Sequence, residues 1–186
     1  MYRANPQNSD NLSEIIFITG GSKSGKSEFA EYLAKKNKNL TYIALSEKRN
    51  EDKHWQQKIY NHRKRRPKSW ELIETSDLLN ILKSEIGPIL IDSIGGFVMK
   101  YIDLKNKDWL AKIDSLIFLL KKRKSPTLIV GEQVGWGLVS EYEIGNIYIE
   151  RIGELQKIIT KISKDNWVAI NGRAIKIDEL SLQIPT

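Results

Sequence analysis

Residues 14–38 read "EIIFITGGSKSGKSEFAEYLAKKNK", and this stretch decides the fold. Residues 14–19 form an apolar run of strand length that ends in a glycine-rich turn. Residues 27–38 then carry apolar side chains at helical spacing, with lysines in the last turn. The stretch is therefore predicted to fold as a strand, a loop and a helix.

The loop "GGSKSGKS" at residues 20–27 matches the phosphate-binding pattern G-x-x-x-x-G-K-[ST]. Glycines let the backbone curl so that successive N–H groups point at phosphate oxygens, and the helix N-terminus adds a positive dipole. We expect Lys26 to contact the β and γ phosphates and Ser27 to bind Mg²⁺. A chance Gly/Ser loop is the alternative, but the strand before it and the helix after it favour nucleotide binding.

Further strands and helices are predicted downstream. Apolar runs of strand length lie at 40–45, 88–93 and 126–131. Helical spacing occupies 52–64, 76–86, 108–122 and 143–163, and one apolar stripe expected in the core is Trp109, Ile113, Leu116, Ile117 and Leu120. Residues 167–177 predict an antiparallel hairpin, because Asn171 and Gly172 tolerate positive φ angles. The alternation indicates an α/β fold of the P-loop NTPase type, with a mostly parallel sheet flanked by helices.

Composition limits the class of protein. The chain has 186 residues, 40% hydrophobic and 28% charged, which fits one domain over 14–186 after a polar, disordered extension at 1–13. It contains no cysteine, so disulfides and thiol chemistry are excluded. No segment resembles a secretory signal or a membrane span, and a cytoplasmic location is expected by default. A net charge of +7 favours anionic partners such as nucleotides or nucleic acid.

Asp92 ends the apolar run "ILID". A carboxylate at the carboxyl end of a buried strand can hold Mg²⁺ directly or through water. The alternative is an ordinary aspartate that caps the following helix. Asp92 is therefore a candidate metal ligand, together with Ser27.

A basic segment, "NHRKRRPKSW", occupies residues 61–70. Trp55, Ile59 and His62 are spaced to share one helical face, and Pro67 marks the end of that helix. A histidine among guanidinium groups is disfavoured as a cation, so His62 is expected to be neutral and nucleophilic, with the arginines available to neutralise a triphosphate. The alternative is a solvated basic helix end with a partly buried histidine.

From about Ile15 to Ile177 the chain resembles the bifunctional adenosylcobinamide kinase and adenosylcobinamide-phosphate guanylyltransferase family of cobalamin biosynthesis. The resemblance rests on "TGGSKSGKSEFAE", "YIAL", "KIYNHRKRRPKSWELIE", "ILIDS" and "VGWGLV". The spacing of histidine, Arg-Pro, Trp and Glu after the phosphate loop is its most specific part. It implies an enzyme that phosphorylates adenosylcobinamide with ATP or GTP and then transfers GMP from GTP to the product.

The resemblance also implies roles for individual residues. The family's nucleophilic histidine falls on His62, which would carry GMP as a phosphoramidate, with Lys26 as a second catalytic residue. Mg²⁺ would lie at Ser27 and Asp92, the partner would be a corrinoid, and the assembly would be a homo-oligomer of trimer type. Nucleotide contacts are expected at Gly20, Gly21, Ser22, Lys23, Ser24, Gly25, Lys26, Ser27, Ala44, Leu45, Ser46, Arg63, Lys64, Arg65, Arg66, Glu74 and Asp92.

The chain also departs from the family pattern. Where the family has "NEVG" this chain has Glu132, Gln133, Val134 and Gly135, and the family's Thr and Asn after Asp92 are replaced by Gly95 and Lys100. The late Asn-Gln pair appears as Gln156 and Lys157. One alternative is therefore a member that keeps only the kinase or only the transferase. Another is a P-loop nucleic-acid-binding module, although the chain lacks a repeated aromatic stacking pattern and we expect no nucleic-acid partner.

Overall fold

The computed structural model describes residues 14–45, 66–84, 86–137 and 140–184. These residues form a seven-stranded sheet in the order β3-β2-β4-β5-β1-β6-β7. Every neighbouring pair is parallel except β6 and β7, which are antiparallel. The strands are β1 Ile15–Gly20, β2 Thr41–Leu45, β3 Glu71–Thr75, β4 Ile89–Asp92, β5 Thr127–Glu132, β6 Asp165–Ile170 and β7 Arg173–Lys176. The predicted mostly parallel α/β fold is confirmed.

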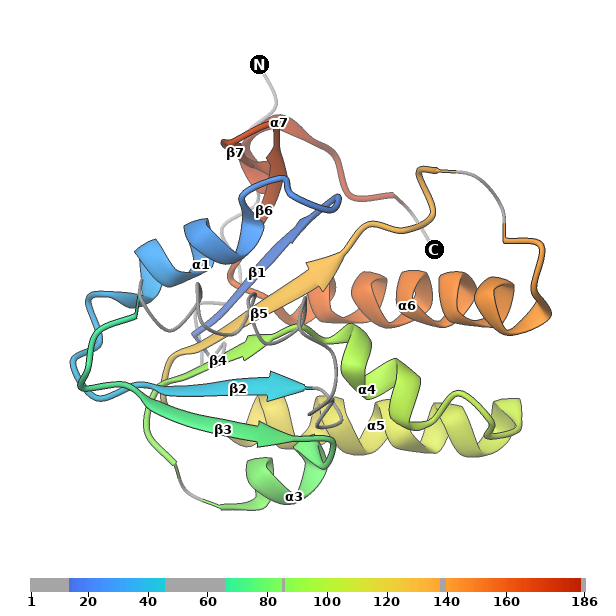
Figure 1. The fold of residues 1–186 in the computed structure, drawn as a ribbon, viewed down its shortest axis with the longest axis horizontal. Helices are drawn as coiled ribbons and strands as arrows, with labels where there is room; N and C mark the ends of the chain where they lie inside the picture. Colours follow the sequence, from blue (N-terminus) through green and yellow to red (C-terminus); the bar gives the residue numbers. More distant parts are fainter. Residues whose placement is uncertain (1–13, 46–65, 85, 138–139, 185–186) are drawn as a thin grey trace, which may run out of the picture.

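Helices cover both faces of the sheet (Figure 1). One face carries α1, and the opposite face carries α4, α5 and α6. Because β1, β2, β4 and β5 are parallel, their carboxyl ends meet at one edge of the sheet. The helices are α1 Lys26–Ala34, α3 Leu78–Lys83, α4 Gly95–Lys100, α5 Asn106–Lys122, α6 Glu143–Ile162 and α7 Ile177–Leu180.

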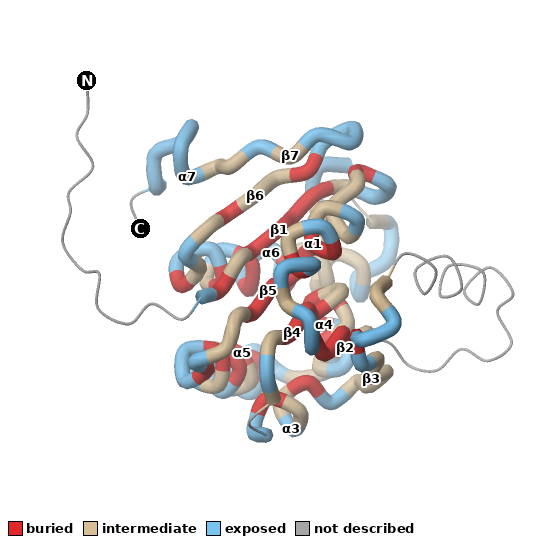
Figure 2. The backbone as a smooth tube through the Cα atoms, turned by 90° about the vertical axis from the view of Figure 1, so that its left-hand side faces the viewer, coloured by how far each residue is buried: buried red, intermediate tan, exposed pale blue. Residues whose placement is uncertain are grey.

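The core is split by the sheet into two apolar clusters. Alternate residues of a strand face opposite sides, so Phe17 packs in the cluster under α4, α5 and α6 while Ile18 packs in the cluster under α1. Figure 2 shows the resulting buried band through β1, β4 and β5 at the centre of the sheet. The predicted stripe on α5 is confirmed: Trp109, Ile113, Leu116 and Leu120 are buried, and Ile117 packs against the same cluster.

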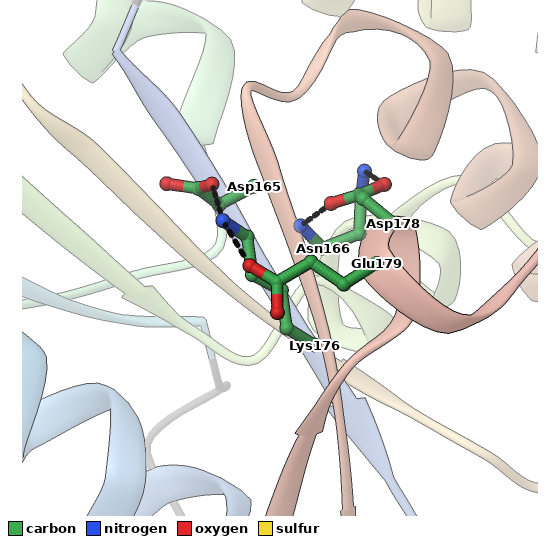
Figure 3. Close-up of polar contacts among 5 residues, drawn as sticks. All are labelled: Asp165, Asn166, Lys176, Asp178 and Glu179. Atoms are coloured by element: carbon green, nitrogen blue, oxygen red, sulfur yellow. Dashed lines mark hydrogen bonds and ion pairs between the residues drawn. The ribbon is translucent and has the colours of Figure 1, made fainter. Parts of the chain in front are cut away.

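The C-terminal hairpin is fastened to the last helix by polar contacts (Figure 3). Lys176 Nζ lies 2.9 Å from Asp165 Oδ1 and 3.2 Å from Glu179 Oε1. The backbone and side-chain nitrogens of Asn166 donate to the two carboxylate oxygens of Asp178, at 2.7 and 2.9 Å. These contacts hold α7 against β6 and β7, so the hairpin presents its turn in a fixed place.

Glycine 153 offers a test of the fold away from any loop. Gly153 lies in the middle of α6 on its solvent-exposed side, and a Cβ added there would meet no atom within 4 Å. Because glycine is a poor helix former, we expect Gly153→Ala to raise the free energy of unfolding by about 0.5–1 kcal/mol in urea denaturation. Gly96→Ala is the contrasting variant, since its Cβ would lie 2.2 Å from the Leu45 carbonyl oxygen and should destabilise. A Gly153→Ala protein less stable than the original chain would contradict this helix assignment.

Candidate active site

The loop between β1 and α1 has the backbone of a phosphate cradle. Lys23 and Gly25 take left-handed conformations, with φ angles of 57° and 93°, and the first helical bond runs from Phe29 N to Gly25 O at 2.9 Å. Alternating backbone conformations of this kind turn successive N–H groups toward one point. The whole predicted contact set Gly20, Gly21, Ser22, Lys23, Ser24, Gly25, Lys26 and Ser27 lies on this loop and the start of α1.

The hairpin supports the loop from behind. Gly172, in the left-handed turn between β6 and β7, donates its N–H to the Ser24 carbonyl oxygen at 2.9 Å. Gly20 lies so close to β6 that a Cβ would be 2.4 Å from the Ala169 carbonyl oxygen. The turn predicted at Asn171 and Gly172 is therefore confirmed, and it also supports the phosphate loop.

Two side-chain oxygens meet at the mouth of the loop. Ser27 Oγ donates to Asp92 Oδ1 at 3.3 Å, across a sequence separation of 65 residues. Oxygens on adjacent corners of a Mg²⁺ octahedron, with bonds of about 2.0–2.1 Å, lie about 2.9 Å apart. The pair therefore fits Mg²⁺, which commonly takes one or two protein ligands and completes its shell with phosphates and water. Lys26 Nζ lies over the same loop and donates to the Gly21 carbonyl oxygen at 3.1 Å.

Tyr42 holds the second oxygen of Asp92. Its hydroxyl donates to Asp92 Oδ2 in a short hydrogen bond. Burial raises the pKa of the Tyr42 hydroxyl well above its usual range, and the charge of Asp92 raises it further, so the hydroxyl remains a donor. The Arg66 guanidinium lies 3.3 Å from the centre of the Tyr42 ring, with its Nε 3.6 Å from Glu31 Oε1. Both oxygens of Asp92 are thus oriented by neighbouring side chains.

We expect Tyr42→Phe to lower the free energy of unfolding by about 1–3 kcal/mol, because Asp92 Oδ2 loses a donor while the ring under Arg66 stays in place. Urea denaturation measures the change. The matched control is Tyr32→Phe, at a tyrosine that is 66% exposed, where the change should stay within about 0.5 kcal/mol. Equal stability of the two variants would show that the Tyr42 hydroxyl contributes nothing.

Glu132 is a site residue that sequence reasoning noted only as a departure from the family pattern. It ends β5, which lies between β4 and β1, and it pairs in register with Gly20. Its carboxylate accepts hydrogen bonds from Ser93 Oγ and from Gly95 N. Burial is the main cause that raises the pKa of this carboxyl; Asp92 adds to the rise, and the two hydrogen bonds and Lys26 oppose it. A polar residue directly after the apolar run "TLIVG" was the available signal.

The other predicted residues divide into two groups. Ala44 is the register partner of Glu74 on β3 and of Asp92 on β4, near the carboxyl ends of these strands. The three residues therefore lie in one row across the sheet, and Leu45 is the next residue along β2. Arg66 contacts Tyr42, as described above. Ser46, His62, Arg63, Lys64 and Arg65 lie outside the described residues, as does the helix predicted over 52–64.

The departures from the family pattern also have defined places. Lys100 forms an ion pair with Asp77 at 3.3 Å, away from the loop. Gln156 is buried and links Thr19 to the backbone of Glu132. Lys157 lines a groove on the outer face of α6, with Asn106 at the start of α5. Gln156 therefore contributes to the site, whereas Lys100 and Lys157 lie on other surfaces.

Comparisons with known proteins agree with this geometry. Residues 16–177 match a family model described as cobinamide kinase / cobinamide phosphate guanyltransferase. The chain is 25% identical over 181 residues to the bifunctional adenosylcobalamin biosynthesis protein CobU of Escherichia coli, covering 88% of this chain and 99% of that protein. It is 24% identical to the CobU of Salmonella typhimurium over the same shares. Against CobP of Pseudomonas aeruginosa it is 27% identical, covering 77% of this chain and 86% of the relative.

A solved structure supports the fold alone. The chain resembles an ATPase from the type III secretion system of pathogenic bacteria with a TM-score of 0.50 and 16% identity. The likeness covers 84% of this chain and about half, 51%, of that structure. In the part of this chain that the structure describes, no helix has the length and apolar character needed to cross a membrane.

Proposed function

The chain belongs to the cobinamide kinase / cobinamide phosphate guanyltransferase family, and we propose that it phosphorylates adenosylcobinamide and then transfers GMP from GTP to the product. The observation that carries the proposal is the pair Ser27 Oγ and Asp92 Oδ1, 3.3 Å apart at the mouth of a phosphate loop that opens α1. The family match, which includes the basic segment after β2, supports the second half of the reaction.

In the kinase half, ATP or GTP would lie with its β and γ phosphates along the loop. The acceptor hydroxyl oxygen forms a bond to the γ phosphorus, the bond from that phosphorus to the β,γ-bridging oxygen breaks, and the hydroxyl proton passes to solvent. Lys26 would stabilise the charge that moves onto the leaving nucleoside diphosphate. Ser27 and Asp92 would hold Mg²⁺, which when bound neutralises phosphate charge.

In the guanylyl half, we assign the nucleophile to His62. A neutral imidazole nitrogen forms a bond to the α phosphorus of GTP, and pyrophosphate leaves. A phosphate oxygen of adenosylcobinamide phosphate then attacks the same phosphorus, the phosphorus–nitrogen bond breaks, and adenosylcobinamide-GDP leaves. Arg63, Lys64, Arg65 and Arg66 would neutralise the triphosphate during the first step. The support for these roles is the sequence pattern and the family match.

A member that keeps one activity is the second candidate. The observation in its favour is that Lys100, at one departing position, pairs with Asp77, and Lys157, at another, lines a groove with Asn106. Loss of the kinase half would leave guanylyl transfer to adenosylcobinamide phosphate as the remaining reaction. A homo-oligomer of trimer type is part of the main proposal, and light scattering of the purified protein tests it.

Two separate assays test the proposed function. The first follows transfer of the γ phosphate of ATP or GTP to adenosylcobinamide, and the second follows transfer of GMP from GTP to chemically prepared adenosylcobinamide phosphate. Both products are expected from the purified protein with Mg²⁺. Activity in one assay alone establishes the one-activity candidate, and activity in neither contradicts the proposal.

A further inference from the structure

A ring of hydrogen bonds surrounds the mouth of the phosphate loop. Ser27 reaches Asp92 on β4, and the next residue, Ser93, donates to the Glu132 carboxylate at the end of β5. Gln156 Nε2 on α6 donates to the Glu132 carbonyl oxygen at 2.9 Å. Gln156 Oε1 accepts from Thr19 Oγ1 at 2.8 Å, and Thr19 directly precedes the loop. The ring thus begins and ends on the loop.

Glu132 is the member of this ring that joins the end of β5 to the connection after β4. Its Oε1 accepts from Ser93 Oγ, and its Oε2 accepts from Gly95 N at 3.1 Å. Both carboxylate oxygens are therefore occupied by donors on the short connection that follows Asp92. A carboxylate fixed in this way restrains that connection and, with it, the direction of the Asp92 side chain.

Gly95 permits this contact. A Cβ at position 95 would lie 2.7 and 2.8 Å from the two Glu132 carboxylate oxygens, and 2.2 Å from the Tyr148 hydroxyl oxygen. Any larger residue would push the carboxylate away from its donors. Gly95 and Glu132 both depart from the family pattern described above, and here they depend on each other.

The far side of the ring is equally well packed. Gln156 and Thr19 are only 6% and 4% exposed, and Gln133 Nε2 donates a second hydrogen bond to Thr19 Oγ1 at 3.1 Å. Gln133 N also donates to the Gly20 carbonyl oxygen at 3.0 Å. Buried networks in which each member is paired hold their atoms in one arrangement. The backbone of Glu132 is therefore held by Gln156, and its side chain extends from this fixed position to Ser93, just after β4.

We propose that Glu132 is a positioning residue for the metal-nucleotide site: it holds Ser93 and Gly95 so that Asp92 faces Ser27. This inference rests on the nucleotide part of the proposed function and not on its corrinoid part. Ser27 and Asp92 would hold the metal, and Glu132 would act through them. Loss of its side chain is expected to weaken metal-dependent nucleotide binding and to leave metal-free binding to the loop unchanged.

Calorimetric titration with ATP, in the presence and absence of Mg²⁺, tests the proposal without any turnover. The quantity compared is the ratio of the dissociation constant without Mg²⁺ to the dissociation constant with Mg²⁺. Loss of a residue that orients a metal ligand typically costs 10- to 100-fold, so Glu132→Ala should lower this ratio by about that factor. Glu132→Gln can still accept from Gly95 N and donate to Ser93 Oγ, so its loss should be less than about tenfold.

Controls separate this role from a general loss of structure. Glu154→Gln changes the same residue type on α6, where Glu154 accepts from Trp109 Nε1 at 3.0 Å, and should leave the ratio unchanged. Ser93→Ala removes one of the two donors without opening the core, and the double variant Ser93→Ala with Glu132→Ala should bind no worse than Glu132→Ala alone. If Glu132→Ala fails to fold, Ser93→Ala keeps the test available, because loss of this donor should also weaken Mg²⁺-dependent binding and a wild-type value would overturn the proposal.

Three results would overturn the proposal. One is a wild-type ratio in Glu132→Ala, and another is an equal loss in Glu154→Gln. The third is a loss in Glu132→Gln as large as in Glu132→Ala, which would assign the effect to the charge and not to position. Because adenosylcobinamide takes no part in the titration, failure of corrinoid phosphorylation would refute the proposed function and leave this result standing.

Discussion

Lys26→Met is expected to lower the rate of phosphoryl transfer to adenosylcobinamide about 100- to 1000-fold, the usual cost of removing one charge-stabilising donor from a transition state. Lys26 Nζ lies over the loop, 3.1 Å from the Gly21 carbonyl oxygen, where the β and γ phosphates would bind. Methionine keeps most of the length of the side chain and removes only the ammonium group. Steady-state kinetics with ATP and Mg²⁺ measure kcat and KM for each substrate separately.

Lys36→Met is the matched control, because Lys36 is an exposed lysine just beyond the C-terminus of α1. It should keep the wild-type kcat, and both variants should have the unfolding midpoint of the original chain. A Lys26→Met enzyme with more than about a tenth of the wild-type kcat would contradict the assignment of the loop as the phosphate site.

The second prediction concerns His62→Ala, which should abolish guanylyl transfer while the kinase step continues. Transfer that passes through a covalent intermediate cannot proceed once its nucleophile is gone, so no adenosylcobinamide-GDP should form from GTP and adenosylcobinamide phosphate. Phosphorylation of adenosylcobinamide should keep the wild-type rate, because Lys26, Ser27 and Asp92 are intact. Chromatography of the two products measures both steps on the same preparation.

The chain provides its own control for this substitution, since it contains two histidines and the other is His54. His54→Ala should retain both activities. Equal loss of guanylyl transfer in both variants would show that the effect comes from disturbing the segment. Full activity of His62→Ala would assign the nucleophile elsewhere.

The elements with strong local signals could be predicted from the sequence. The apolar run before "GGSKSGKS" became β1, and the Asn171-Gly172 dipeptide became the turn between β6 and β7 with φ angles of 50° and 75°. These predictions succeeded because the local residue types permit few other conformations. Ser27 and Asp92, the two predicted metal ligands, lie within hydrogen-bond distance of each other, since the ends of parallel strands meet at one edge.

β3 and α4 were not predicted, for different physical reasons. Among the described residues β3 pairs with β2 alone, at the edge of the sheet, and its sequence "ELIET" alternates too weakly to indicate a strand. α4 begins with Gly95 and Gly96, which are poor helix formers. Both positions require glycine because other groups approach the backbone closely. Glu132 and Tyr148 lie against Gly95, and Leu45 lies against Gly96. Tertiary packing therefore overrides local propensity in this helix.

Glu132 and Tyr42 were missed as site residues because their contacts depend on strand order. β5 follows β4 in the chain but lies between β4 and β1 in the sheet, and this places Glu132 beside Gly20. Tyr42 looked like an ordinary strand residue until β2 was found next to β4, which brings its hydroxyl to Asp92. Neither neighbourhood can be inferred from spacing along one chain.

The most direct test of the central claim is covalent labelling with GTP that carries radioactive phosphorus at the α position. The protein, incubated with this GTP and Mg²⁺ and then denatured, is expected to retain label in a bond that is labile to acid and stable to base, as a phosphoramidate is. The label should remain in His54→Ala and be absent from His62→Ala. An unlabelled wild-type protein, or undiminished label in His62→Ala, would refute a covalent intermediate on His62.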